Sequence, residues 1–144
     1  MRKIGIASDH AGYLFKEIIK QNLIAQGYDI IDFGTNSEDS MDYPDTAHPL
    51  ALSVEGRESE IGIIFCGSGN GVNMTVNKHQ GIRGALCWSA EIARMARLHN
   101  DANIVAIPAR FTSQEEALEI VSTFLTTTFE GGRHLNRINK IPCQ

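Results

Sequence analysis

Five short apolar segments alternate with amphipathic segments along this chain of 144 residues. Buried strands are predicted from length and composition at residues 3–8, 29–33, 61–66, 82–87 and 103–108. Between them, apolar residues recur at three- and four-residue spacing, which predicts amphipathic helices. Because parallel strands are joined by helical crossovers, the alternation predicts an α/β fold in which helices cover both faces of a five-stranded parallel sheet.

The expected topology places the candidate site. Right-handed crossovers leave few arrangements of five strands, and the commonest order is 2-1-3-4-5. In that order strands 1 and 3 are neighbours whose outgoing loops diverge, which creates a ligand-binding crevice at the C-terminal edge of the sheet. Asp9 and His10 follow strand 1, and Cys66 ends strand 3. We therefore expect one domain over residues 1–144, with its site between these two loops.

The loop after strand 3 has the sequence Cys66-Gly67-Ser68-Gly69-Asn70-Gly71. Its glycines let successive N–H groups turn toward one point, and such a loop before a helix N-terminus binds anions. A helix N-terminus lowers the pKa of a nearby thiol, so Cys66 is a candidate base. Ser68 and the N–H groups of Gly69–Gly71 are candidate donors to an oxyanion, which suits proton abstraction beside a carbonyl. The alternatives are a plain tight turn and a cysteine that only fills the core.

Basic residues gather at the C-terminus of a chain whose formal net charge is −4. Residues 131–144 form a predicted helical tail that contains Arg133, Arg137 and Lys140 and no acidic residue. The net charge argues against nucleic acid as a partner, and the local basic excess suggests a small anion. Arg133 and Arg137 are four residues apart and can share one phosphate, with Arg110 as a third cation. A solvated basic end is the alternative. The apolar residues expected to dock the tail are Leu135, Ile138 and Ile141.

His99 and Asn100 end the helix that precedes strand 5, so we expect them at the edge of the sheet opposite the crevice. A strand of five or six residues spans ~17–20 Å. If His99 takes part in catalysis, it therefore serves the site of another subunit. The alternative is a histidine that only complements the helix dipole. His10, in contrast, lies at the crevice, where ligand binding competes with a plain surface hydrogen bond as its role.

Composition narrows the class further. The three cysteines, at 66, 87 and 143, lack C-x-x-C spacing, which argues against a disulfide framework or a zinc site and favours a reducing, cytoplasmic compartment. The N-terminus lacks a signal-peptide pattern, and no apolar run approaches the ~20 residues of a membrane helix. Neither G-x-G-x-x-G nor G-x-x-x-x-G-K-[ST] occurs, so no nucleotide cofactor is expected.

These motifs resemble one family, the type B ribose-5-phosphate isomerases, which are grouped with the subunits of galactose-6-phosphate isomerase. The resemblance covers essentially all of the chain and is carried by Ser8–Gly12, Asp42–Pro44, Cys66–Gly71, Asn77–Lys78, Gly81–Arg83, His99–Asn103 and Glu130–His134 with Arg137. It implies a Rossmann-like three-layer αβα sandwich. It also implies a metal-free aldose–ketose isomerase of the pentose phosphate pathway that interconverts ribose 5-phosphate and ribulose 5-phosphate, as a homodimer or dimer of dimers with shared active sites.

Carried over residue by residue, the resemblance makes Cys66 the base that moves a proton between C2 and C1. Ser68 and the N–H groups of Gly67–Gly71 stabilise the enediolate, and His99 of the partner subunit assists ring opening together with Asp9. The residues implied in substrate binding are His10, Tyr43, Gly67, Gly69, Asn70, Gly71, Asn100, Arg110, Arg133 and Arg137. Of these, His10 and the three arginines are expected to hold the phosphate. The resemblance implies no metal site.

Two departures from the family pattern bear on mechanism. Many members carry Thr where this chain has Ser68, and the hydroxyl is kept. Another branch has Gly in place of Cys66 and a Glu base where this chain has Val72, so the cysteine route is the consistent one here. Allose 6-phosphate or galactose 6-phosphate is the alternative substrate. A non-catalytic phosphosugar-binding protein and a thiol redox protein are the alternative classes.

Overall fold

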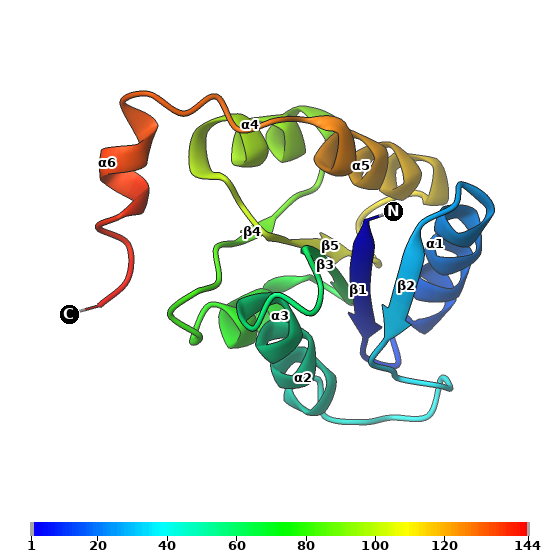
Figure 1. The fold of residues 1–144 in the computed structure, drawn as a ribbon. Coiled ribbons are helices and arrows are strands. Elements are labelled where there is room, and N and C mark those ends of the chain that lie inside the picture. Colours follow the sequence, from blue (N-terminus) through cyan, green and yellow to red (C-terminus); the bar gives the residue numbers. More distant parts are fainter. Residues whose placement is uncertain (1, 144) are drawn as a thin grey trace.

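The computed structural model describes residues 2–143, in which strands and helices alternate as predicted (Figure 1). The strands are β1 (Lys3–Ser8), β2 (Asp29–Asp32), β3 (Ile61–Cys66), β4 (Gly84–Leu86) and β5 (Ile104–Pro108). The helices are α1 (Tyr13–Ala25), α2 (Pro44–Glu55), α3 (Asn70–Val76), α4 (Ala90–Asn100), α5 (Gln114–Thr126) and α6 (His134–Ile138). The first and last residues of the predicted domain, and the last residue of its predicted tail, lie outside the described residues.

All five strands are parallel, which confirms the predicted α/β class, but their order is β2-β1-β3-β5-β4. The predicted order 2-1-3-4-5 is therefore wrong for the last two strands, because β5 lies between β3 and β4. The reason is burial: β5 is apolar and buried at all five positions, whereas β4 has three half-buried residues. A strand covered on both faces and flanked on both sides needs the longer apolar run, so β4 is left at the edge.

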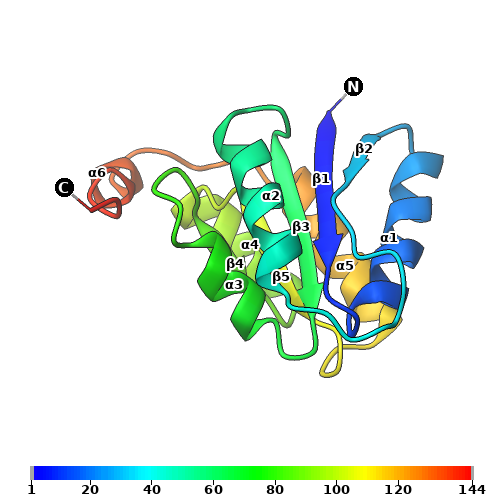
Figure 2. The same ribbon diagram turned by 90° about the horizontal axis from the view of Figure 1, so that it is seen from below.

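The sheet lies between two layers of helices (Figures 1 and 2). Alternate residues of β3 supply two separate cores, because successive side chains of a strand point to opposite faces. Ile63 and Phe65 pack with α1, α4 and α5, whereas Ile64 and Cys66 pack with α2 and α3. Cys66 therefore faces the α2–α3 layer.

A buried ion cluster fixes the end of β2 to α1. The Lys16 side chain is 0% exposed, and its Nζ lies 2.7 Å from Oδ2 of Asp32 and 2.8 Å from Glu17. Lys20 lies 2.8 Å from the same Asp32 oxygen, and Oδ1 of Asp32 accepts the N–H of Gly34 at 2.9 Å. Burial opposes ionisation of Asp32, but the hydrogen bonds from Lys16 and Lys20 outweigh it and lower the pKa of this carboxyl.

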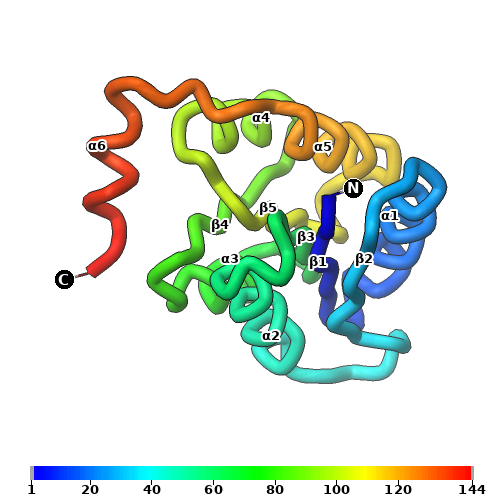
Figure 3. Tube along the Cα trace, in the orientation of Figure 1, coloured from blue at the N-terminus to red at the C-terminus, as the bar shows by residue number. Residues whose placement is uncertain are grey.

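The chain after α5 leaves the body of the molecule and places α6 beyond α4 (Figures 1 and 3). Ile138 is buried, as predicted for a docking residue, but Leu135 and Ile141 are exposed, so that part of the prediction is wrong. A helix of five residues that packs against α4 buries only one side, and His134 occupies the other buried position. Among the described residues, no helix is long and apolar enough to span a membrane.

Candidate active site

The path of the loop between β3 and α3 depends on one glycine. Gly69 has φ +75° and precedes the first residue of α3. A Cβ at this position would lie 2.4 Å from Cδ1 of Leu86 and 3.2 Å from the backbone nitrogen of Pro108. Only glycine satisfies both the left-handed backbone and the close approach of β5. The loop after Cys66 is therefore held in one path by its own sequence.

The Cys66 side chain lies between the core and this loop. Cys66 is 5% exposed and packs with α2 and α3, yet its Sγ accepts the N–H of Gly69 at 3.1 Å. The hydroxyl of Ser68 is exposed and accepts the N–H of Asn70 at 3.3 Å. Two backbone donors thus point at the two side chains expected to act on substrate. Cys87 lies in the opposite core, where burial raises the pKa of its thiol to about 12.

Asp9 and His10 lie beside this loop, as the predicted β1–β3 pairing requires. The backbone N–H of Asp9 donates to the carbonyl of Phe65 at 3.1 Å, which joins the two strand ends directly. The carboxylate of Asp9 is buried and accepts the N–H of Gly12 at 3.1 Å. Nδ1 of His10 accepts the N–H of Met41 at 3.2 Å, which leaves Nε2 as the protonated nitrogen of the neutral ring. His10 therefore presents a donor at this edge.

The side chains of Tyr43 and Arg110 pack against the same loop at two further glycines. A Cβ on Gly71 would lie 2.5 Å from the Tyr43 ring, and a Cβ on Gly67 would lie 3.1 Å from Nη1 of Arg110. The Arg110 N–H also donates to the carbonyl of Gly67 at 2.9 Å. A hollow of about 160 Å³ adjoins the loop and is lined in part by Tyr43, His48 and Gly71. The structure thus brings together Asp9, His10, Tyr43, Arg110 and Cys66–Gly71, and we call this set the loop group.

The other predicted residues, His99, Asn100, Arg133 and Arg137, do not join the loop group. We call these four the helix group. The carbonyl of Asn100 accepts Nε of Arg83 at 3.1 Å, and Arg83 directly precedes β4, so this end of α4 lies where strands begin. The loop group lies where strands end, and five residues of β5 span about 16 Å between the two edges. The expected separation of His99 from the crevice is therefore confirmed.

A larger hollow at the edge where strands begin is a less suitable anion site. Its volume is about 330 Å³, and Glu60 and Asn103, which precede β3 and β5, are among its lining residues. Three of its four arginines are already paired within the chain: Arg97 and Arg83 lie 2.9 Å and 3.5 Å from carboxylate oxygens of Asp101, and Arg2 lies 3.3 Å from Glu60.

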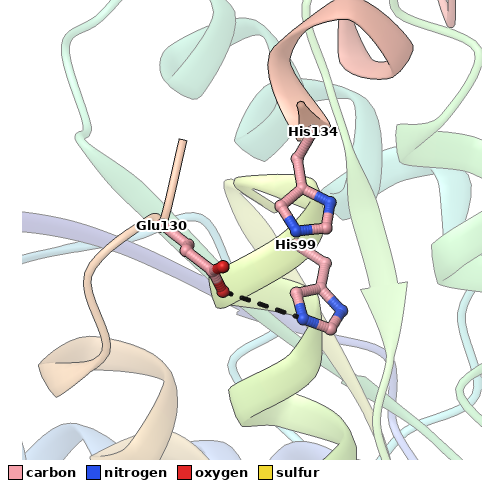
Figure 4. Close-up of side chains that lie close together, drawn as sticks. All are labelled: His99, Glu130 and His134. Atoms are coloured by element: carbon pink, nitrogen blue, oxygen red, sulfur yellow. Dashed lines mark ion pairs between the residues drawn. The ribbon is translucent and has the colours of Figure 1, made fainter. Parts of the chain in front are cut away.

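The contact of His99 with Glu130 and His134 was not predicted from the sequence. Its ring stacks on that of His134, with centroids 4.5 Å apart and planes at 19°, and its Nε2 lies 3.9 Å from Oε2 of Glu130 (Figure 4). Burial lowers the pKa of His134, and the positive charges of His99 and Arg133 lower it further. The sequence signal for this contact was His134 beside Arg133 in a tail without acidic residues. The segment after α5 has no periodicity, however, so the sequence does not show which of its side chains turn inward.

Comparison with known proteins identifies the family of the chain. The family model described as Ribose/Galactose Isomerase matches residues 4–141. The ribose-5-phosphate isomerase B of Escherichia coli K12 is 40% identical over 98% of this chain and 95% of its own length. The crystal structure of a ribose 5-phosphate isomerase from Thermotoga maritima has TM-score 0.96 and 48% identity, covering 98% of this chain and 97% of that one. A Mycoplasma genitalium structure, ribose-5-phosphate isomerase B with bound ribulose-5-phosphate, has TM-score 0.93 and 42% identity, with 96% and 93% covered.

Fold and relatives together define the class, which is a sugar-phosphate isomerase built on a Rossmann-like α/β sheet. More particularly, the chain belongs to the ribose/galactose isomerase family. The family resemblance expected from the motifs is thereby confirmed.

Proposed function

We propose that this chain interconverts ribose 5-phosphate and ribulose 5-phosphate, a step of the pentose phosphate pathway. The observation that carries the proposal is the loop group, in which a thiol, a hydroxyl and backbone donors meet beside Asp9 and His10. The relatives named as ribose-5-phosphate isomerase B, one of them with bound ribulose-5-phosphate, supply the substrate class.

In the proposed reaction Cys66 acts as the base. Its thiolate removes the proton from C2 of the open-chain aldose, and the electron pair forms the C1–C2 double bond of an enediolate. The proton returns to C1, and the hydroxyl proton on the oxygen of C2 passes to the oxygen of C1, so that the aldehyde becomes a hydroxymethyl group and C2 becomes the ketone. Ser68 and the N–H groups of Gly67, Gly69, Asn70 and Gly71 stabilise the oxyanion, because donors aimed at developing charge lower the barrier. The residues need no metal or organic cofactor for these steps.

We further propose that the helix group completes the site of a neighbouring subunit. Within one chain it lies about a strand length from Cys66, too far to share one substrate. His99 of the partner subunit then opens the sugar ring together with Asp9, and Asn100 of the partner subunit contacts the sugar. Because α6 packs on α4, which carries His99, one chain would supply Arg133 and Arg137 along with it. His10 and Arg110 hold the same phosphate from the other side, and Tyr43 lines the pocket.

This arrangement requires a homodimer or a dimer of dimers. The proposal also places the chain in the cytoplasm, in keeping with three free cysteines at positions 66, 87 and 143.

Isomerisation of a six-carbon phosphosugar is the second candidate. The family model that matches the chain covers galactose as well as ribose isomerases, so allose 6-phosphate and galactose 6-phosphate are the substrates to compare. A non-catalytic phosphosugar-binding protein would use the same phosphate ligands but would leave the substrate unchanged.

A substrate panel tests the proposed function. Ribose, allose and galactose phosphates are assayed for conversion to the ketose, each with and without a chelator. We expect the highest kcat/KM for ribose 5-phosphate and equal rates with the chelator present. Higher turnover of a six-carbon substrate would favour the second candidate, binding without turnover would favour the binding protein, and chelator-sensitive turnover would contradict the metal-free mechanism.

A further inference from the structure

Three side chains of different elements converge at the outer end of α4. His99 belongs to the last turn of α4, Glu130 to the segment after α5, and His134 begins α6. One potential ligand atom of each lies within 4.8 Å of the other two. Figure 4 shows a ring nitrogen of each histidine on the side where the Glu130 carboxylate lies. Among the described residues, no other group of three His, Cys, Asp or Glu side chains converges in this way.

A second observation is that one ring nitrogen of this cluster is buried and unpaired. His134 is 8% exposed, and its Nε2 is a buried atom that has no hydrogen-bond partner within residues 2–143. Buried ring nitrogens are normally paired, because an unpaired one loses its interaction with water and gains nothing in return. The Nε2 atom is therefore available to a group that approaches from the side of Glu130.

Two imidazoles and one carboxylate form the donor set of zinc and related transition-metal ions, with a fourth position open. Calcium and magnesium prefer oxygen ligands and suit the cluster poorly. With metal–ligand bonds of about 2.0–2.1 Å, two ligand atoms on a tetrahedral ion lie about 3.3 Å apart. To reach that geometry, the exposed Glu130 and the half-exposed His99 move by about 1.5 Å, and the His99 ring also turns out of its stack on His134 so that both lone pairs meet at one ion. We propose that His99, Glu130 and His134 form a binding site for one zinc-type divalent ion.

A second histidine pair shows that two neighbouring histidines do not by themselves make a metal site. Nδ1 of His48 and Nε2 of His79 lie 2.8 Å apart and hydrogen-bond to each other, and Nδ1 of His79 lies 3.7 Å from Glu55. These ring nitrogens already have partners, so the pair offers no open set of lone pairs. It provides a matched control with the same side-chain chemistry elsewhere on the surface.

The consequence for the enzyme rests on the proposed function, in which His99 serves a neighbouring active site. An ion on His99 would withdraw its ring from the substrate without taking part in the reaction. The site is therefore inhibitory, and zinc would slow isomerisation by occupying a group that the metal-free reaction needs.

The binding test uses the full chain, stripped of metal with a chelator and then dialysed. Zn²⁺ is titrated by calorimetry, and Co²⁺ replaces it for absorption spectroscopy, with His134→Asn, Glu130→Gln and the control His48→Asn compared. We expect one ion per chain, bound roughly 10–100-fold more weakly or worse after either of the first two substitutions, and unchanged binding in the control. Equal affinity in all four proteins would overturn the proposal, as would a Co²⁺ spectrum dominated by sulfur-to-metal charge transfer, which would assign the ion to a cysteine.

A separate measurement follows turnover. Each protein's rate with Zn²⁺ is divided by its own zinc-free rate, so that any loss of basal activity cancels. We expect inhibition in the unsubstituted chain and relief of it in Glu130→Gln. If the chain isomerises ribose 5-phosphate but binds no zinc, only this inference fails. If it binds zinc at these residues but turns over no phosphosugar, the proposed function fails and the site stands.

Discussion

The loop group and the helix group are built in different ways. Backbone conformation fixes the loop group, because glycines at 67, 69 and 71 admit Arg110, β5 and the Tyr43 ring where side chains would collide. Side chains on two helices make up the helix group, and one of those helices has five residues and packs against α4. The first arrangement is preorganised, as the stabilisation of a short-lived anion requires.

The difference suggests a division of work between subunits. Proton transfer needs groups held within a fraction of an ångström, and the sheet edge supplies them. In the proposed function, phosphate binding and ring opening tolerate the less rigid helix group, provided that the neighbouring subunit completes the site. Under the proposed function, a chain with these two groups at opposite edges of its sheet would be active only as an assembled oligomer, and the following substitutions test each group separately.

The largest effect is expected for Cys66→Ala. Removal of the base should lower kcat by at least about 10³-fold, within the range for loss of a general base, while ribose 5-phosphate still binds. Steady-state kinetics and calorimetry with the same preparation measure both quantities. Cys87→Ala is the control, because burial raises the pKa of that thiol to about 12 and it is not a base at neutral pH. Full activity in Cys66→Ala would remove the loop group from the chemistry.

The next largest effect concerns the helix group. His99→Asn should lower kcat by about 100-fold. Mixing it with Cys66→Ala chains at equal concentration should restore about a quarter of normal activity, because half of the dimers then contain one complete site. Chains are exchanged by mild dissociation and reassembly before assay. Mixtures that form mixed dimers but stay inactive would show that both residues act within one chain.

Local signals explain how much of the fold was predictable. Lys3–Ser8 and Ile61–Cys66 were found at their exact bounds, since apolar runs and turn residues lie next to each other in the sequence. The start of α5 is also marked by a local signal, a Ser with a Glu three residues later, and Ser113 and Glu116 exchange the hydrogen bonds of a capping box at 2.8 and 3.1 Å. The order of β4 and β5 was missed because it depends on which of two distant strands buries more surface, and no local pattern decides that competition.

The candidate site shows the same limit. Asp9 and Cys66 could be placed together because adjacent parallel strands end at the same edge. The contact of Tyr43 with Gly71 could not, because it depends on how the long loop before α2 folds back. Glu130 and His134 belong to a motif that carries the family resemblance, but their proximity to His99 was missed, because it arises from packing of the irregular segment after α5.

A pair of glycine substitutions compares the rigidity of the two regions. In Gly12→Ala the new Cβ would lie 2.4 Å from Cβ and 2.9 Å from the carbonyl oxygen of Phe65, so we expect a loss of about 3 kcal/mol of unfolding free energy. Gly132, before α6, has φ +62° and no atom within 4 Å of an added Cβ, so Gly132→Ala should cost about 1 kcal/mol. Urea denaturation measures both. Equal losses would mean that the turn between β1 and α1, which packs against the end of β3, is no more tightly packed than the tail.

The smallest effect is a pH dependence of the unfolding free energy, which we expect from Asp32 at the end of β2. The pKa of Asp32 is lowered below its ordinary 3.8 in the folded chain, since its bonds with Lys16 and Lys20 outweigh the effect of burial. Its contribution to stability is therefore complete above pH 3.8 and is lost as the pH falls through the folded-state pKa, at about 1.4 kcal/mol for each unit of lowering. Asp32→Asn should flatten the stability curve in this acid range. Asp29 also lies on β2, and Asp29→Asn removes only a 3.9 Å surface pair with Lys3 of β1. This variant should keep the slope of stability against pH that the unsubstituted chain shows. If both variants keep the slope, the ion cluster does not stabilise the end of β2.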